Sequence, residues 1–135
     1  MRTICIAEDN DLDQRIIRLT IARYFSFMHV LFFGEGLSLL NYIKCNGKDP
    51  QRLPDLILLD LSMSVLDGWD FLAEFNDIKY SFAKCIQIYI VSVSILPVEV
   101  MKAKQYEFVK DFISKPLSKE KLGAIIGQEL LAPKY

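Results

Sequence analysis

Five short apolar runs alternate with five longer stretches of helical periodicity, and this alternation restricts the fold more than any other feature of the sequence. The apolar runs occupy residues 2–7, 28–33, 56–59, 85–93 and 108–113. Apolar residues recur at helical spacing in residues 11–25, 37–45, 68–77, 98–106 and 118–130. Strict alternation of this kind indicates parallel strands covered by helices on both faces. The sequence therefore predicts an α/β fold with a doubly wound, five-stranded parallel sheet and five helices.

The length of the chain limits it to one domain. With 135 residues and no repeat, low-complexity tract or linker, the sequence leaves little room for a second core. We expect a single domain over residues 1–135 with no effector domain. Met1 directly before the first run and the short tail after the last helix favour a complete chain, although an excised fragment stays an alternative.

Charge and hydropathy argue against nucleic acid and membrane as partners. The formal net charge is −1, and lysines and arginines form no basic block. The longest apolar stretch, near residues 85–96, is interrupted by Gln87, Ser92 and Ser94, and no signal peptide precedes the first run. We expect a cytoplasmic protein.

The cysteines and the histidine exclude several kinds of site. Cys5, Cys45 and Cys85 are odd in number and lack CxxC spacing, so neither disulfides nor a zinc site is expected, and we interpret them as buried reduced thiols. His29 is the only histidine, which argues against a catalytic triad.

Polar residues follow the apolar runs at the predicted strand ends. Glu8 and Asp9 follow the first run, Asp60 ends the third, Ser92 lies near the end of the fourth, and Lys115 follows the fifth. In open α/β sheets, ligands bind beyond the carboxyl ends of the strands. The sequence therefore predicts that these side chains converge on one cleft.

Their chemistry indicates a metal-dependent phosphoryl acceptor. Three carboxylates in one cleft repel each other, and a divalent cation, Mg²⁺ or Mn²⁺, resolves this with oxygen ligands. Asp60 then acts as a nucleophile toward a phosphoryl group whose oxygens the metal, Lys115 and Ser92 neutralise. Each residue alone has a plainer interpretation: the 8–11 segment caps the first helix, with Asp11 as the candidate, Asp60 is a turn residue and Lys115 a surface charge.

Four motifs together resemble the receiver domain of response regulators in two-component signalling. They are Glu8-Asp9-Asn10, the run from Asp60 through Met63 to Asp67-Gly68, then Ser92, and Lys115-Pro116. The resemblance covers nearly the whole chain. It implies a flavodoxin-like sheet with strand order 2-1-3-4-5.

The resemblance also assigns roles to residues. Asp60 would be the phosphorylated residue and a metal ligand. Asp9 would bind Mg²⁺ directly, Glu8 mostly through water, and Ser62 through its backbone carbonyl. Ser92 would be the switch hydroxyl, Lys115 would pair with the phosphate before a cis peptide bond to Pro116, and Phe112 would be the aromatic that changes rotamer.

By the same resemblance, a histidine kinase or a histidine phosphotransfer protein would donate the phosphoryl group. The fourth helix, fifth strand and fifth helix would form the output face of a stand-alone receiver, for an unknown downstream protein. The chain would not be an enzyme beyond self-catalysed phosphorylation and slow autodephosphorylation. A phosphorylation-dependent homodimer is a further partner that the resemblance allows.

Two positions depart from the family pattern. Ser64 stands where the family usually has proline, so the loop after Asp60 is expected to be less rigid. Val93 stands where a small residue is usual after Ser92, and its bulk would narrow access to the phosphoryl group. Ser94 stays a secondary candidate for the switch hydroxyl, because a continuing strand would place it on the same face as Ser92.

Three rival functions are open to test. An FMN carrier shares the fold, but Glu8 and Asp9 would repel its phosphate. An aspartyl-phosphate phosphatase needs a second aspartate two residues after the nucleophile, where Ser62 stands. A pseudo-receiver, an interaction module without phosphorylation, is favoured only by Ser64 and Val93.

Overall fold

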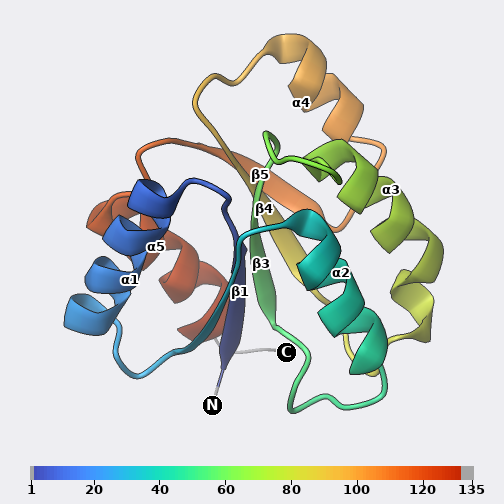
Figure 1. Ribbon diagram of the computed structural model, residues 1–135, viewed down its shortest axis with the longest axis horizontal. Helices are drawn as coiled ribbons and strands as arrows, with labels where there is room; N and C mark the ends of the chain where they lie inside the picture. Colours follow the sequence, from blue (N-terminus) through green and yellow to red (C-terminus); the bar gives the residue numbers. More distant parts are fainter. Residues whose placement is uncertain (1, 132–135) are drawn as a thin grey trace.

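The computed structural model describes residues 2–131 and confirms the predicted sheet (Figure 1). All five strands are parallel, in the order β2-β1-β3-β4-β5. Their bounds are β1 (Thr3–Ala7), β2 (His29–Phe33), β3 (Leu56–Asp60), β4 (Gln87–Ser92) and β5 (Val109–Ser114). The predicted domain limits at residues 1 and 135 lie outside the described residues.

A helix follows each strand, as predicted. The helices are α1 (Asp11–Tyr24), α2 (Gly36–Cys45), α3 (Gly68–Ile78), α4 (Pro97–Ala103) and α5 (Lys119–Ile126), with a 3₁₀ turn η1 (Lys79–Ser81) and a π-helical segment η2 (Gly127–Leu131). The prediction was wrong where α4 ends, because this helix stops at Ala103. The last helical stretch reaches Leu131, close to its predicted end, but changes from α-helix to the π-helical η2 at Gly127, a residue that weakens α-helices.

Alternate residues of the central strands separate two cores on opposite faces of the sheet. Ile4 and Ile6 of β1 pack under α1 and α5, whereas Cys5 and Ala7 pack under α2 and α3. Both β1 and β3 are buried along their whole length, because helices cover each face. Figure 1 shows α1 and α5 on one side of the sheet and α2 and α3 on the other.

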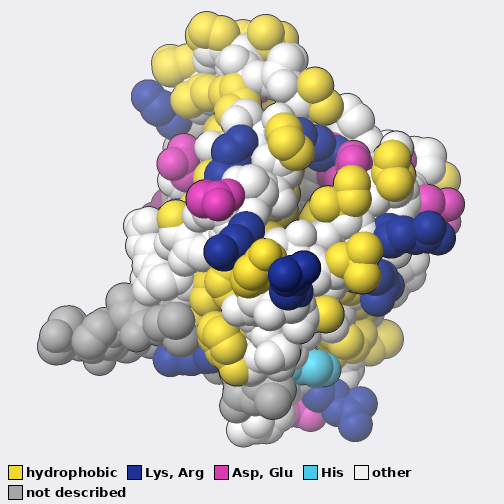
Figure 2. Space-filling view, turned by 90° about the vertical axis from the view of Figure 1, so that its left-hand side faces the viewer, with side chains coloured by type: hydrophobic (Ala, Val, Ile, Leu, Met, Phe, Trp, Pro, Cys, Tyr) yellow, Lys and Arg dark blue, Asp and Glu magenta, His cyan; other side chains and the backbone are white. Residues whose placement is uncertain are grey.

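The first helix buries fewer of its apolar residues than its periodicity suggests. Ile17 and Ile21, one turn apart, face the sheet, while Leu12, Ile16 and Leu19 are exposed. Figure 2 shows the side of the molecule formed by α1 and α5, where apolar side chains lie between basic ones. Further apolar side chains gather at the top of this view, over α4. Helical spacing alone thus does not identify the buried face of α1.

Two predictions about single residues also need correction. Asn10, not Asp11, caps α1: its side chain accepts a hydrogen bond from the Asp13 N–H at 2.9 Å. Cys5 is buried as expected, but Cys45 and Cys85 are exposed, because one ends α2 and the other precedes β4. Within residues 2–131, the longest helix is α1 with 14 residues, and no helix is apolar and long enough to span a bilayer.

Candidate functional site

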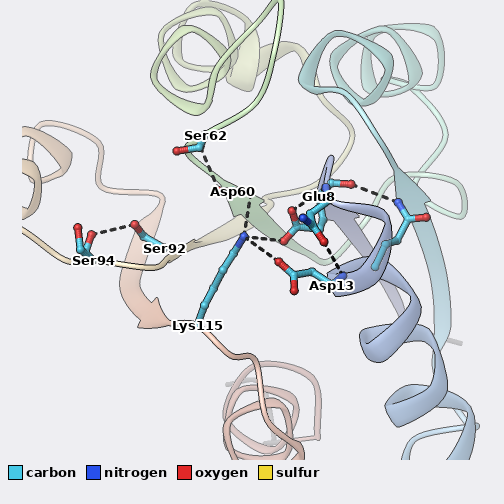
Figure 3. A network of polar contacts seen from close by, with 9 residues as sticks. Glu8, Asp13, Asp60, Ser62, Ser92, Ser94 and Lys115 are labelled. Atoms are coloured by element: carbon cyan, nitrogen blue, oxygen red, sulfur yellow. Dashed lines mark hydrogen bonds and ion pairs between the residues drawn. The ribbon is translucent and has the colours of Figure 1, made fainter.

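Four strands bring the predicted polar residues to one end of the sheet. Glu8 follows β1 directly, Asp60 is the last residue of β3, Ser92 is the last of β4, and Lys115 follows β5. Parallel strands end at the same edge, so these residues come together although the chain separates them widely. Figure 3 shows Glu8 and Asp60 around the end of the Lys115 side chain, with Ser92 to one side.

The Lys115 ammonium lies at the centre of this cluster. Its Nζ is 2.8 Å from Glu8 Oε1, 3.0 Å from Asp60 Oδ2 and 3.6 Å from Asp13 Oδ2. Glu8 and Asp60 are only 3% and 5% exposed, so both carboxylates depend on this cation for compensation. The surface-charge interpretation of Lys115 is therefore excluded.

Burial and these contacts act in opposite directions on the ionisation of the cluster. Burial raises the pKa of Glu8 to about 7, although its hydrogen bond from Lys115 favours the charged form. Burial alone would lower the pKa of Lys115, but its hydrogen bonds to Glu8 and Asp60 prevail and raise it above the usual range. Lys115 is therefore held in its charged form. The raised pKa of Glu8 indicates that this one ammonium does not fully compensate the buried carboxylates.

The start of the loop after Asp60 is held by close backbone contacts. The Ser62 N–H donates to Asp60 Oδ1 at 3.0 Å, which orients the carboxylate. A Cβ on Gly68 would lie 2.7 Å from Leu61 Cα, so only glycine lets α3 begin this close to β3. Asp67 and Asp70 form a capping box there, with Asp70 N–H donating to Asp67 Oδ1 at 2.8 Å.

Val65 introduces strain into the same loop. Its φ is 68°, and the Leu66 N–H donates to the Ser64 carbonyl at 2.8 Å, which closes a three-residue turn around it. A β-branched residue rarely adopts positive φ, because its Cβ approaches the backbone carbonyl too closely. Ser64 in place of the usual proline was evident in the sequence, whereas the strain at its neighbour Val65 was not predicted, although valine at this position was visible in the motif.

Three carboxylates form a candidate cation site beside Lys115. One carboxylate oxygen each from Glu8, Asp9 and Asp60 lies within 4.8 Å of the others, with Asp9 exposed to solvent. An all-oxygen donor set of this kind suits Mg²⁺ or Mn²⁺, so the residues present fit the predicted metal. The metal-binding role of the Ser62 carbonyl stays a prediction.

Ser92 is engaged away from Asp60. Its hydroxyl donates to the Ser94 carbonyl at 2.8 Å. β4 ends at Ser92. The expectation that a continuing strand places Ser94 on the same face as Ser92 is therefore wrong. The side chain of Val93 between them is 80% exposed.

Two further predicted residues belong to β5 and to the segment after it, Phe112 and Pro116. Phe112 is half-buried and borders a cavity of about 190 Å³ beside Val100 and Ala103 of α4. The Lys115–Pro116 peptide bond is cis.

Two contributors to the cluster were not predicted from the sequence. Asp13 contacts Lys115 from the first turn of α1, and the Gln14 side-chain amide donates to the Glu8 carbonyl at 3.2 Å. Their position one turn after the acidic motif, on a helix leaving the same strand end, was the available signal.

The fold and site define a parallel α/β domain with an acidic pocket, and comparison with known proteins gives its family. A model of the response regulator receiver domain matches residues 4–127. The chain belongs to the response regulator receiver domain family, as a receiver domain of a two-component response regulator with an acidic pocket.

Solved structures agree in fold. A two-component response regulator from Legionella pneumophila is 17% identical, with a TM-score of 0.81 and coverage of 98% of this chain and 100% of that one. The phosphorylated cyanobacterial phytochrome response regulator RcpA is 25% identical, with a TM-score of 0.76 and coverage of 98% and 96%. The receiver domain of a sensor histidine kinase from Pseudomonas aeruginosa, with magnesium in its active-site cleft, is 19% identical, with a TM-score of 0.76 and coverage of 97% and 98%.

Proposed function

We propose that this chain is a phosphorylation switch that accepts a phosphoryl group on Asp60 in a reaction that depends on Mg²⁺ or Mn²⁺. One observation carries the proposal: a nearly buried Asp60 carboxylate lies 3.0 Å from the Lys115 ammonium and beside Glu8 and Asp9. A structural aspartate would need only its counter-charge, whereas two further acidic groups at the same point favour a bound cation. The similar receiver domain from Pseudomonas aeruginosa, which has magnesium in its active-site cleft, supports this proposal.

The donor is a phospho-histidine of a histidine kinase or of a histidine phosphotransfer protein. An Asp60 Oδ atom attacks phosphorus, the P–N bond breaks, and the electron pair and a proton remain on the imidazole. When bound, the metal supplies positive charge to the phosphoryl oxygens. Lys115 is already placed to neutralise another oxygen, and the Ser62 N–H holds the second oxygen of Asp60.

Phosphorylation of Asp60 would change the conformation of two side chains, Ser92 and Phe112, and through them the surface around α4. Ser92 must exchange its hydrogen bond to the Ser94 carbonyl for one to a phosphoryl oxygen, which a charged acceptor favours. Phe112 borders a cavity of about 190 Å³ that leaves room for a rotamer change under α4. Such a shift would bias a two-state surface built from α4, β5 and α5.

That surface offers apolar groups to a downstream protein or to a second copy of the chain. Val98 and Met101 of α4 are 71% and 65% exposed. Apolar side chains gather over α4 in Figure 2. Phosphorylation-dependent dimerisation through this surface would appear in light scattering with and without a phosphoryl mimic.

The chain is not expected to turn over phosphate esters. Ser62 occupies the place of the acid–base aspartate in aspartyl-phosphate phosphatases, so a persistent acyl phosphate with slow autodephosphorylation is the expected outcome. Rapid multiple turnover of a phosphate ester would contradict this.

Intact-mass spectrometry after incubation with acetyl phosphate tests the proposal. We expect one phosphoryl adduct that requires Mg²⁺, is absent in Asp60→Asn, and persists in Asp77→Asn, a matched change on the exposed end of α3. No adduct with any small donor or divalent metal would overturn the proposal and leave a pseudo-receiver. An adduct that survives Asp60→Asn would place the acceptor elsewhere.

A further inference from the structure

A second cavity lies at the opposite end of the sheet from Asp60. It has a volume of about 290 Å³ and opens where the chain passes from α3 through η1 to β4, beside the start of β5. The volume suits a small ligand and is too small for a dinucleotide cofactor.

Aromatic rings form the inner wall of this cavity. Phe75, Phe82 and Phe108, which we call the phenylalanine cluster, all border it. The Phe75 ring centroid lies 5.7 Å from that of Phe82 and 4.8 Å from that of Phe108. A wall of this kind favours a planar ring, which gains both apolar burial and aromatic contact.

Three lysines and one glutamate border the cavity. Lys79 Nζ lies 5.0 Å from the Tyr80 and Phe108 ring centroids and 4.0 Å from the carboxylate of Glu107, a side chain that is 83% exposed. Lys84 also borders the cavity, but its charge is met by Asp55 at 3.1 Å. The contact to Glu107 is long and its carboxylate is largely in solvent, so a bound anion can compete for the Lys79 ammonium.

A β-bulge adds Lys110 to the same opening. Ile88 pairs with Val109 and Tyr89 with Asp111, so Lys110 between them has no partner on β4. Bulges commonly re-aim a side chain at a sheet edge, and here the residue that is set free borders the cavity. Among residues 2–131, Lys110 makes no hydrogen bond or ion pair through its ammonium.

A polar atom in the wall also lacks a partner. Gln87 borders the cavity, and its Oε1 is the buried side-chain nitrogen or oxygen of the described chain that has no hydrogen bond. Such atoms are rare because leaving them unpaired costs free energy. A small shift of the amide would let it accept a hydrogen bond from a ring N–H or amino group.

We propose that this cavity binds a small aromatic anion, a planar ring that carries a carboxylate or phosphate and a hydrogen-bond donor. The ring packs against the phenylalanine cluster, the anionic group pairs with Lys79 and Lys110, and the donor reaches Gln87. Purine nucleotides and indole carboxylates share this chemistry, so the test separates them. The site is independent of Asp60, because Gln87 begins β4 and Ser92 at the other end lies by the acidic pocket.

Titration of the unphosphorylated full chain in EDTA, followed by calorimetry and by ¹⁵N amide shifts, tests the proposal. The probes are adenosine monophosphate and indole-3-acetate, with adenosine as the ring alone and inorganic phosphate as the anion alone. We expect one of the two ring anions to bind saturably, with shifts at the amides of Gln87 and Lys110. Each control should bind at least about tenfold more weakly, because it lacks half of the contacts.

A charge-removing pair of variants completes the test. Lys110→Gln should weaken the binding probe about tenfold, whereas Lys119→Gln, an exposed lysine on α5, should leave it unchanged. The proposal is overturned if neither ring anion binds, if phosphate alone binds equally well, if the shifts map elsewhere, or if Lys110→Gln binds like the wild type. None of these outcomes depends on phosphorylation of Asp60, whose own test is the mass adduct.

Discussion

Lys115 Nζ lies 3.0 Å from Asp60 Oδ2, across 55 residues of sequence. The same ammonium lies 2.8 Å from Glu8 Oε1, so one cation stands between the two most buried acidic groups of the described chain. The site is therefore held together by a charge that both carboxylates share. Removing the ammonium should lower the stability of the fold, whereas removing an exposed carboxylate should lower the affinity for the metal.

Replacing the lysine should destabilise the fold. Lys115→Met leaves Glu8 and Asp60 facing each other without a counter-charge, which costs about 3 kcal/mol of unfolding free energy. Urea denaturation in EDTA measures this, with Lys119→Met as the exposed control. Adding Mg²⁺ should recover part of the loss, because a cation at the three carboxylates restores compensation. Equal stabilities of the two variants would show that the ion pairs contribute nothing net.

Removing the exposed carboxylate should affect metal binding alone. Asp9 belongs to the candidate cation site but is exposed, so Asp9→Asn should leave unfolding in EDTA within about 0.5 kcal/mol of wild type. Its Mg²⁺ affinity should fall at least about tenfold, and the rise of Tm with Mg²⁺ should shrink accordingly. Calorimetric titration of Mg²⁺ checks this, and Asp77→Asn should bind like the wild type. Unchanged affinity in Asp9→Asn would remove Asp9 from the ligand set.

Relieving the strained turn should stabilise the protein. Val65 has a φ of 68° and is 82% exposed, so its side chain loses little packing when replaced. Val65→Asn, which tolerates this conformation, should raise the unfolding free energy by about 1 kcal/mol. Val98→Asn, at an exposed helical position of α4, provides the matched control and should bring no gain. A Val65→Asn variant no more stable than wild type would mean that the turn is unstrained in solution.

Alkaline pH should loosen the contact between β4 and η2. The Tyr89 hydroxyl donates to Glu129 Oε1 at 2.6 Å, and burial together with this acceptor raises the pKa of Tyr89 above its usual range, with Asp111 adding to the effect. A raised folded-state pKa means that the stabilisation is complete below the unfolded tyrosine pKa, about 10, and is lost as pH rises beyond it. Urea midpoints between pH 8 and pH 11 should therefore fall above pH 10.

Tyr89→Phe is the control for this pH dependence. It should cost about 1 kcal/mol near neutral pH, because the hydrogen bond is lost, and should flatten the fall above pH 10. An equally steep fall in Tyr89→Phe would assign the alkaline transition to other groups.

A smaller side chain at Val93, next to Ser92, should shorten the lifetime of the phosphoryl group on Asp60 without changing the stability of the fold. Val93 follows Ser92 and is 80% exposed, so it takes no part in the core. Val93→Ala should speed autodephosphorylation by roughly two- to tenfold, because a smaller side chain admits water more easily. Loss of the mass adduct over time measures the rate, with Val98→Ala as control. Identical lifetimes would show that Val93 does not cover the phosphoryl group.

Much of the site was predictable because its residues occupy strand ends. Glu8, Asp60 and Lys115 stand out as charged groups directly after apolar runs, and parallel strands carry such residues to one edge. Asn10 as the cap in place of Asp11 was not predictable with certainty, since both residue types cap helices well. The exposed face of α1 escaped prediction for a related reason: Leu12 and Leu19 fit the helical period, but only packing against the sheet selects Ile17 and Ile21.

The order and type of the elements, the parallel sheet and the acidic motif follow from the sequence, because periodicity and local composition act over a few residues. The folded structure is needed to show which distant groups meet: Lys115 with Glu8 and Asp60, and Lys110 with Gln87 at one cavity. Such contacts depend on strand register and on helix packing across the whole sheet. A pattern that repeats every two or four residues does not specify either.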